Sequence, residues 1–116
     1  MPTYLHPESD DELLAFAGLY EFWPDPELPE GHEDKWRMTA TIITRAAPDS
    51  LSHIHDRTPV IVPTSMHNEW LDPELTDKSD VRSLIAAIPD PKLIPTVVAA
   101  EVGNIRNNGP ELIKGV

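Results

Sequence analysis

Thirteen prolines divide this chain of 116 residues into short segments. Proline has no backbone N–H to donate, and its ring clashes with the preceding turn of a helix, so it interrupts helices and central strands. Most of the thirteen lie between candidate elements, which favours short strands and loops over a helix bundle. Because helical patterns come late in the chain, the sequence predicts an α+β fold of mostly antiparallel strands with two short helices.

The length of the chain allows one domain with a single modest core. Hydrophobic residues make up 40% of the sequence, which is typical of a globular protein. The formal net charge of −11 disfavours a broad electrostatic interaction with phosphates, so a nucleic-acid role would need a local basic site. The absence of cysteine excludes disulfides, thiolate metal sites and a cysteine nucleophile within this chain.

No apolar run approaches the length of a membrane span, and residues 1–20 lack the basic start of a signal peptide. We therefore expect a cytoplasmic protein with no membrane partner.

Two segments with strand patterns lie on either side of an acidic, proline-rich loop at residues 24–34. Residues 15–23 are rich in aromatic side chains, and residues 35–44 alternate between apolar and more polar positions. We predict that these two segments pair as antiparallel neighbours across the loop. Residues 58–62 predict a third, short strand, and the β-branched run 93–102 predicts a fourth.

The helical patterns in the sequence are weaker and shorter than the strand patterns. Residues 46–55 predict a turn and a short helix. Ser65 predicts the N-cap of a helix that ends near Leu71, and Asp80 predicts the N-cap of a longer one. The longer helix has apolar residues at the spacing of a buried stripe: Val81, Leu84, Ile85 and Ile88. Residues 1–14 predict an irregular or briefly helical start, and residues 103–110 predict a polar tail.

The densest group of titratable side chains lies in the segment LSHIHDRTPVIV, residues 51–62. His55 is followed directly by Asp56 and Arg57. One neighbour could orient the imidazole while the other binds an anionic group. Alternatively, the histidine closes a hydrogen bond at the strand entrance and the two charged residues cap a turn. The residues alone do not decide between these interpretations.

Alternation along residues 15–23 places Glu21 on one strand face with Leu19 and Trp23. A carboxylate in such apolar surroundings would be partly desolvated, which favours its protonated form and suits a general acid or base. The alternative is a strand-end glutamate that points to solvent or pairs with an arginine. A catalytic role requires Glu21 to lie within reach of His55 in one shared cleft, and we expect that cleft.

Several other residues are candidates for contacts with a ligand. Thr44 ends the second predicted strand, where its hydroxyl could donate to a ligand or only bond the local backbone. Phe22 and Trp23 could stack on unpaired bases or belong to a core. The candidate phosphate contacts are Arg57 and Arg106. The pattern His53-x-His55-Asp56 would be a partial metal site, but no third ligand is evident, so we expect no metal and no cofactor.

Five blocks, taken in order, resemble the SOS response-associated peptidase (SRAP) family: AGLYEFW, TIITRAA, LSHIHDRTPVIV, WLD and VGNIRNNGPELI. The resemblance extends from about residue 14 to about residue 113 and covers only the C-terminal half of that domain. It implies the SRAP fold, a mostly antiparallel sheet or partial barrel, with the N-terminal half of the domain missing. We therefore expect residues 1–116 to be a single, partial SRAP-like domain.

The resemblance implies a sensor of abasic sites in single-stranded DNA that acts in the SOS response and is nucleoid-associated when on DNA. Family members are implied to act as peptidases on themselves and as lyases on abasic DNA, with an N-terminal cysteine forming a thiazolidine cross-link. Glu21 in YEF and His55 in HDR match the family's catalytic glutamate and histidine. The matching supporting or DNA-binding residues are Thr44, Arg57, Phe22 and Trp23.

The chain departs from the family at the nucleophile, because it has no cysteine and begins MPTYLHPES. The N-terminal half would have to come from another chain or from a longer gene product. Three functions stay open: the acid/base half of an abasic-site sensor, a catalytically inactive acidic remnant that binds protein, and a hydrolase acting through Glu21 and His55. A half-domain would also expose strand edges and apolar faces, so we expect it to dimerise or aggregate.

Overall fold

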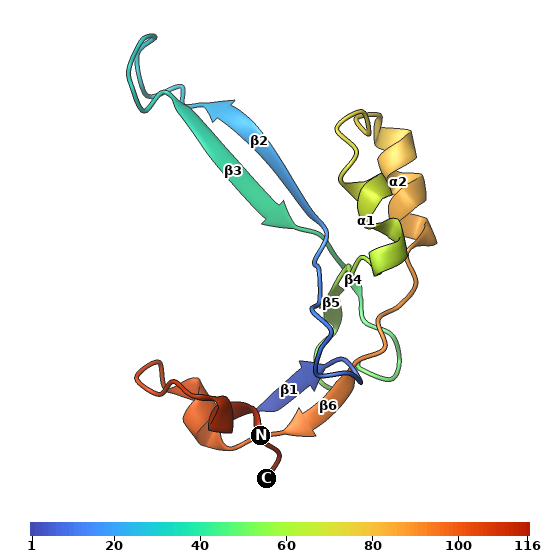
Figure 1. Ribbon diagram of the computed structural model, residues 1–116. Helices are drawn as coiled ribbons and strands as arrows, with labels where there is room; N and C mark the ends of the chain where they lie inside the picture. The colour runs from blue at the N-terminus through green and yellow to red at the C-terminus, as the bar shows by residue number, and fades with distance from the viewer. The chain divides into compact units, whose positions relative to one another are not determined.

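The computed structural model describes residues 1–116 and combines antiparallel strands with short helices (Figure 1). The strands are β1 (Thr3–His6), β2 (Gly18–Pro24), β3 (Trp36–Ile42), β4 (Thr44–Ala46), β5 (Arg57–Pro59) and β6 (Ile94–Val97). The α-helices are α1 (His67–Trp70) and α2 (Lys78–Ala87), and 3-10 helices form at Thr64–Met66, Ala100–Gly103 and Pro110–Ile113. Three two-stranded antiparallel sheets result, β1–β6, β2–β3 and β4–β5. The predicted α+β class is confirmed, and no sheet closes into a barrel.

The chain divides into two compact units. One is Ala15–Pro89, which contains β2 to β5 and both α-helices. The other combines Met1–Leu14 with Asp90–Val116 and contains β1 and β6. None of the helices is both long enough and apolar enough to cross a lipid bilayer.

The β2–β3 hairpin confirms the predicted pairing across the acidic loop. Its register runs from Gly18 opposite Ile42 to Pro24 opposite Trp36. Because side chains alternate along a strand, this register sorts the residues onto two faces. The apolar face consists of Tyr20, Phe22, Pro24, Trp36, Met38, Ala40 and Ile42. The opposite face, called the Glu21 face below, consists of Leu19, Glu21, Trp23, Arg37, Thr39 and Thr41.

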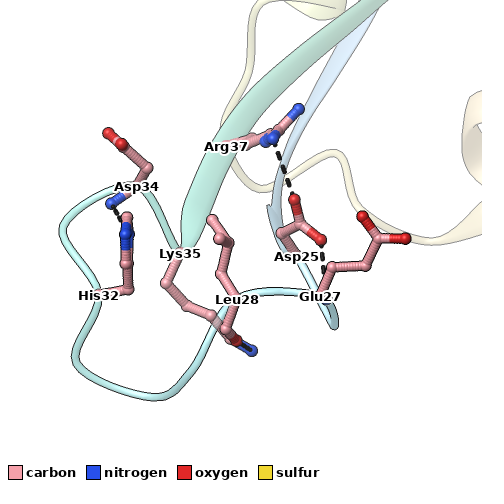
Figure 2. Close-up of polar contacts among 7 residues, drawn as sticks. All are labelled: Asp25, Glu27, Leu28, His32, Asp34, Lys35 and Arg37. Atoms are coloured by element: carbon pink, nitrogen blue, oxygen red, sulfur yellow. Dashed lines mark hydrogen bonds and ion pairs between the residues drawn. The ribbon is translucent and has the colours of Figure 1, made fainter.

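Two buried charged residues order the loop between β2 and β3 (Figure 2). The carboxylate of Asp25 accepts a hydrogen bond from the backbone N–H of Glu27 at 3.0 Å and pairs with the guanidinium of Arg37 at 3.0 Å. The ammonium of Lys35 donates to the backbone carbonyl of Leu28 at 2.8 Å. Each buried charge therefore has a polar partner, and these contacts hold the loop at Glu27 and Leu28 to the ends of the two strands.

A ring of three backbone hydrogen bonds marks the base of the hairpin. Ala17 donates to Val60 at 2.8 Å, Val60 donates to Ile43 at 2.9 Å, and Ile43 donates to Ala17 at 2.9 Å. Ala17 and Val60 are fully buried. The buried hydrophobic core around this ring consists of Ala17, Val60, Val62 and Ile88, with Ile43, Met66, Trp70 and Ile85 packed against it.

The structure corrects the predicted end of the second strand. Thr44 does not end a strand that continues from residue 35, because β3 ends at Ile42 and Thr44 begins β4. The interruption falls at Ile43, which bonds to both Ala17 and Val60. The chain therefore exchanges β2 for β5 as its pairing partner at this residue.

The predicted short helix within residues 46–55 is wrong. The backbone there forms consecutive turns, in which Leu51 and Ser52 donate to the carbonyl of Pro48, and His55 donates to that of Leu51. These turns carry the chain from β4 back to β5, where Ala46 lies opposite Arg57. The third strand is also shorter than predicted, because β5 ends at Pro59.

Two predicted N-caps are wrong as well. The N-cap of α2 is Asp77 rather than Asp80, since its carboxylate accepts hydrogen bonds from the N–H groups of Ser79 and Asp80 at 2.9 and 3.1 Å. Ser65 lies within a 3-10 helix, and the N-cap of α1 is Met66. The predicted apolar stripe of α2 is confirmed, because its members are the less exposed positions: Val81, Leu84, Ile85 and Ile88.

The prediction of an irregular or briefly helical start at residues 1–14 is wrong for Thr3–His6, which form a strand, whereas residues 7–14 are irregular as predicted. In β1, Thr3 to His6 pair with Val97 to Ile94 of β6. The imidazole of His6 lies 2.7 Å from the hydroxyl of Thr96 and 2.9 Å from the carbonyl of Pro7, and its ring stacks on Tyr4. The predicted fourth strand, 93–102, shortens to β6 and ends in a 3-10 helix.

Candidate functional site

The β4–β5 pair brings together two of the residues singled out in the sequence. A guanidinium N–H of Arg57 donates to the backbone carbonyl of Thr44 at 2.9 Å and to its hydroxyl at 3.0 Å. Both residues are exposed. Because one nitrogen, Nη2, makes both contacts, the guanidinium is held in place while its other N–H groups stay available to an anion.

His55 lies beside this pair. Its Nδ1 accepts a hydrogen bond from the backbone N–H of Arg57 at 3.0 Å, and it lies 3.2 Å from a carboxylate oxygen of Asp56. Accepting the N–H requires a lone pair on Nδ1, so the neutral imidazole carries its proton on Nε2. The contact with Asp56 becomes an ion pair only when the ring is protonated. Since the side chain is 70% exposed, Nε2 is available for proton exchange.

Glu21 lies in the middle of β2, opposite Thr39. The prediction that apolar neighbours desolvate its carboxylate is not met, because Glu21 is exposed and its face also carries Arg37, Thr39 and Thr41. The cation of this face is Arg37, which pairs with Asp25 and was not among the predicted site residues. Alternation in residues 35–44 already placed it there.

No hydrogen bond or ion pair joins Glu21 to His55. Glu21 lies opposite Thr39, before the interruption at Ile43, whereas Arg57 lies opposite Ala46, after it. Thr39 and Ala46 are seven positions apart in the sequence, which is at most roughly 23 Å of extended chain at about 3.3 Å per residue. Glu21 thus belongs to the β2–β3 sheet and His55 lies in the turn that precedes β5, and a cleft shared by them stays a prediction.

The two aromatic candidates lie on opposite faces of the hairpin. Trp23 belongs to the Glu21 face, opposite Arg37, and Phe22 belongs to the apolar face, opposite Met38. They are 40% and 62% exposed, so neither is a core residue in this chain. A flat ligand on one face can stack on only one of them.

Arg106, the other candidate phosphate contact, belongs to the other compact unit. The backbone N–H of Arg106 donates to the side chain of Asn104 in a local turn of the other unit. No three side chains of His, Asp or Glu lie close enough together to hold a metal ion.

The sequence model of the SOS response associated peptidase (SRAP) family matches residues 1–105. The chain belongs to the SRAP family. This confirms the resemblance found in the five sequence blocks. The match also includes the strand β1, which precedes the first of those blocks.

Relatives within the SRAP family are named abasic site processing proteins. YoqW of Bacillus subtilis is 39% identical over 102 residues, which are 88% of this chain and 43% of YoqW. HMCES of Xenopus tropicalis is 33% identical over 105 residues, which are 90% of this chain and 29% of HMCES. The chain therefore spans less than half the length of these SRAP proteins and corresponds to their C-terminal part.

The fold of this SRAP chain is similar to a crystal structure of a protein from Bacteroides thetaiotaomicron. The TM-score is 0.70 at 22% identity, over 99% of this chain and 48% of that one. This similarity supports the α+β fold, and again less than half of the larger chain has a counterpart here.

Proposed function

We propose that this chain supplies the acid/base and DNA-contacting part of an SRAP site that processes abasic sites in single-stranded DNA. The observation that carries the proposal is the exposed cluster on β4 and β5, where Arg57 contacts Thr44 and lies beside His55. Relatives named for abasic site processing supply the substrate class.

The ring-opened sugar of an abasic site is an aldehyde, and its condensation with a nucleophile moves protons to and from oxygen. In the proposed site, Nε2 of His55 exchanges a proton with the sugar, and the Glu21 carboxylate acts as the second acid or base. Arg57 binds a neighbouring phosphate with the N–H groups that Thr44 does not use. Trp23, on the Glu21 face, stacks on an unpaired base.

The nucleophile lies outside this sequence, since it contains no cysteine. We propose that it comes from a segment equivalent to the part of the SRAP relatives that this chain does not match. That segment belongs either to the same gene product or to a second chain. The proposed location is the cytoplasm, at the nucleoid when the protein is on DNA.

A second function, a protein-binding module without catalysis, is favoured by the net charge of −11 and by the missing cysteine. It predicts weak DNA binding that does not change with salt, because few phosphates would be neutralised.

Covalent capture of DNA tests the proposed function. An abasic single-stranded oligonucleotide is incubated with the chain alone and with the chain plus the unmatched segment of YoqW, then resolved on a denaturing gel. We expect a cross-linked band only with both polypeptides and only on abasic DNA. No band under either condition would remove the catalytic proposal.

A further inference from the structure

The apolar face of the β2–β3 hairpin contains no polar or charged side chain other than the phenol of Tyr20. All of its residues are exposed. The exposed fractions of its large side chains are 71% for Tyr20, 62% for Phe22, 62% for Trp36, 70% for Met38 and 56% for Ile42. Contiguous exposed apolar surface of this kind marks an interaction site in a soluble protein.

The two faces of the hairpin differ in a way that indicates which one is covered. Charged and hydroxyl side chains lie on the Glu21 face, in Glu21, Arg37, Thr39 and Thr41. An antiparallel sheet sorted in this way packs its apolar side on another layer and leaves the other side to solvent. Nothing within the unit that contains the hairpin supplies that layer, because every residue of β2 and β3 is exposed.

The hairpin is also incomplete at its edges. β2 and β3 pair only with each other, so each has an unpaired outer edge. An isolated two-stranded hairpin is marginally stable in water and needs further strands or a packed layer. An occupant that covers the apolar face and pairs with an edge would satisfy both needs.

A groove at the base of the hairpin extends this surface within the same unit. It measures about 380 Å³ and lies between the start of β2 and the segment from α1 to α2. Its apolar walls include Leu19 and Tyr20 of β2 and Leu71 after α1, which is 74% exposed. Tyr20 belongs to the apolar face and Leu19 to the Glu21 face, so the groove adjoins both faces, and an occupant of the apolar face can reach it past Tyr20.

We propose that the apolar face is the docking surface for the part of the SRAP domain that lies outside this sequence. The chain matches 43% of YoqW, so more than half of that relative has no counterpart here and is available to form the missing layer. A second copy is a poorer occupant, because dimerisation would bring together two chains that each have a net charge of −11. The inference rests on the proposed function for the partner's identity, but its test needs no DNA.

The test uses two substitutions on the same strand. Met38→Asp places a carboxylate on the apolar face, and Thr41→Asp places the same charge on the Glu21 face. Both side chains are exposed, so neither substitution disturbs a buried contact, and circular dichroism checks that both variants fold. The probe is the unmatched segment of Bacillus subtilis YoqW, co-expressed with the full chain, and the readouts are the mass of the complex by light scattering and Kd by titration.

We expect a one-to-one complex with the unaltered chain. Met38→Asp should weaken Kd by about tenfold or more, because it buries an unpaired charge, whereas Thr41→Asp should change Kd by less than about threefold. Hydrogen exchange in β2 and β3 should slow when the segment binds.

Three outcomes would overturn the proposal. The first is the absence of a complex, and the second is an equal effect of the two substitutions on Kd. The third is a defined dimer of this chain that Met38→Asp disperses and that the YoqW segment does not compete with. A complex that is sensitive to Met38→Asp but captures no abasic DNA would leave the docking surface intact and remove only the proposed function. Capture of abasic DNA without such a complex would leave the proposed function intact and remove the docking surface.

Discussion

The guanidinium of Arg57 is held by Thr44, whose carbonyl and hydroxyl accept hydrogen bonds at 2.9 and 3.0 Å. The two residues are 13 apart in sequence and meet because β4 and β5 pair. The backbone N–H of the same arginine donates to the imidazole of His55, so a fixed cation and an exposed imidazole lie two residues apart on an acidic protein. In the proposed function, phosphate recognition would therefore depend on a local site rather than on net charge.

Replacing Arg57 with alanine should weaken binding of abasic single-stranded DNA and lower the slope of log K against log salt by about 0.7, the value for one phosphate contact on a single strand. Arg57→Lys should keep most of the slope, because the positive charge remains. It should lose the planar guanidinium that donates to Thr44. Fluorescence anisotropy at several salt concentrations, with the YoqW segment present, measures both. Arg82→Ala, which removes an exposed guanidinium from α2 in the same unit, is the matched control, and an equal effect of both alanine substitutions would contradict the assigned role.

His55→Ala should slow the covalent capture of abasic DNA by roughly a hundredfold or more, the usual contribution of a general acid or base. His53→Ala is the matched control, since it removes another exposed imidazole two residues away. The rate of capture is followed on denaturing gels. Equal rates for the two variants would show that the imidazole of His55 takes no part in proton transfer.

Asp25→Ala should destabilise the hairpin loop by about 1–3 kcal/mol, because it removes the carboxylate that accepts the backbone N–H of Glu27 and pairs with Arg37. Glu33→Ala, which changes an exposed carboxylate in the same loop, should alter the free energy of unfolding by less than about 0.5 kcal/mol. Denaturant unfolding and hydrogen exchange at residues 25–35 measure the two effects. Similar values for both variants would mean that the buried contacts of Asp25 do not order the loop.

Asp77→Ala should cost α2 about 1 kcal/mol, because the carboxylate accepts the N–H groups of Ser79 and Asp80. Asp80→Ala should cost less, about 0.3–1 kcal/mol, since Asp80 interacts only with the helix dipole from the first turn. The comparison is made by thermal or denaturant unfolding. A larger loss in Asp80→Ala would restore Asp80 as the N-cap.

The isolated chain should self-associate at micromolar concentration, and added salt should increase the association by screening the repulsion between acidic chains. Met38→Asp should reduce the association, because it places a charge within the exposed apolar face. Light scattering over a concentration series tests this. A monomer that melts sharply at all salt concentrations would contradict it.

Local patterns in the sequence were sufficient for the elements whose partners are near in the chain. Alternation on both sides of the acidic loop predicted the β2–β3 pairing and its two faces, since hairpin register follows from a period of two. The apolar stripe of α2 followed from helical spacing in the same way. The SRAP blocks likewise needed no structure to be recognised.

Only the tertiary structure decided the features that depend on distant or competing partners. β1 was missed because its strand partner, β6, is about 90 residues away, and nothing local in the segment TYLH signals that pairing. Asp77 and Asp80 are equally good caps by residue type, and the extended backbone at Asp77 selects between them. Alternation placed Glu21 on its face but could not say whether anything covers that face, because desolvation depends on what packs against the hairpin, and that is decided by distant parts of the chain.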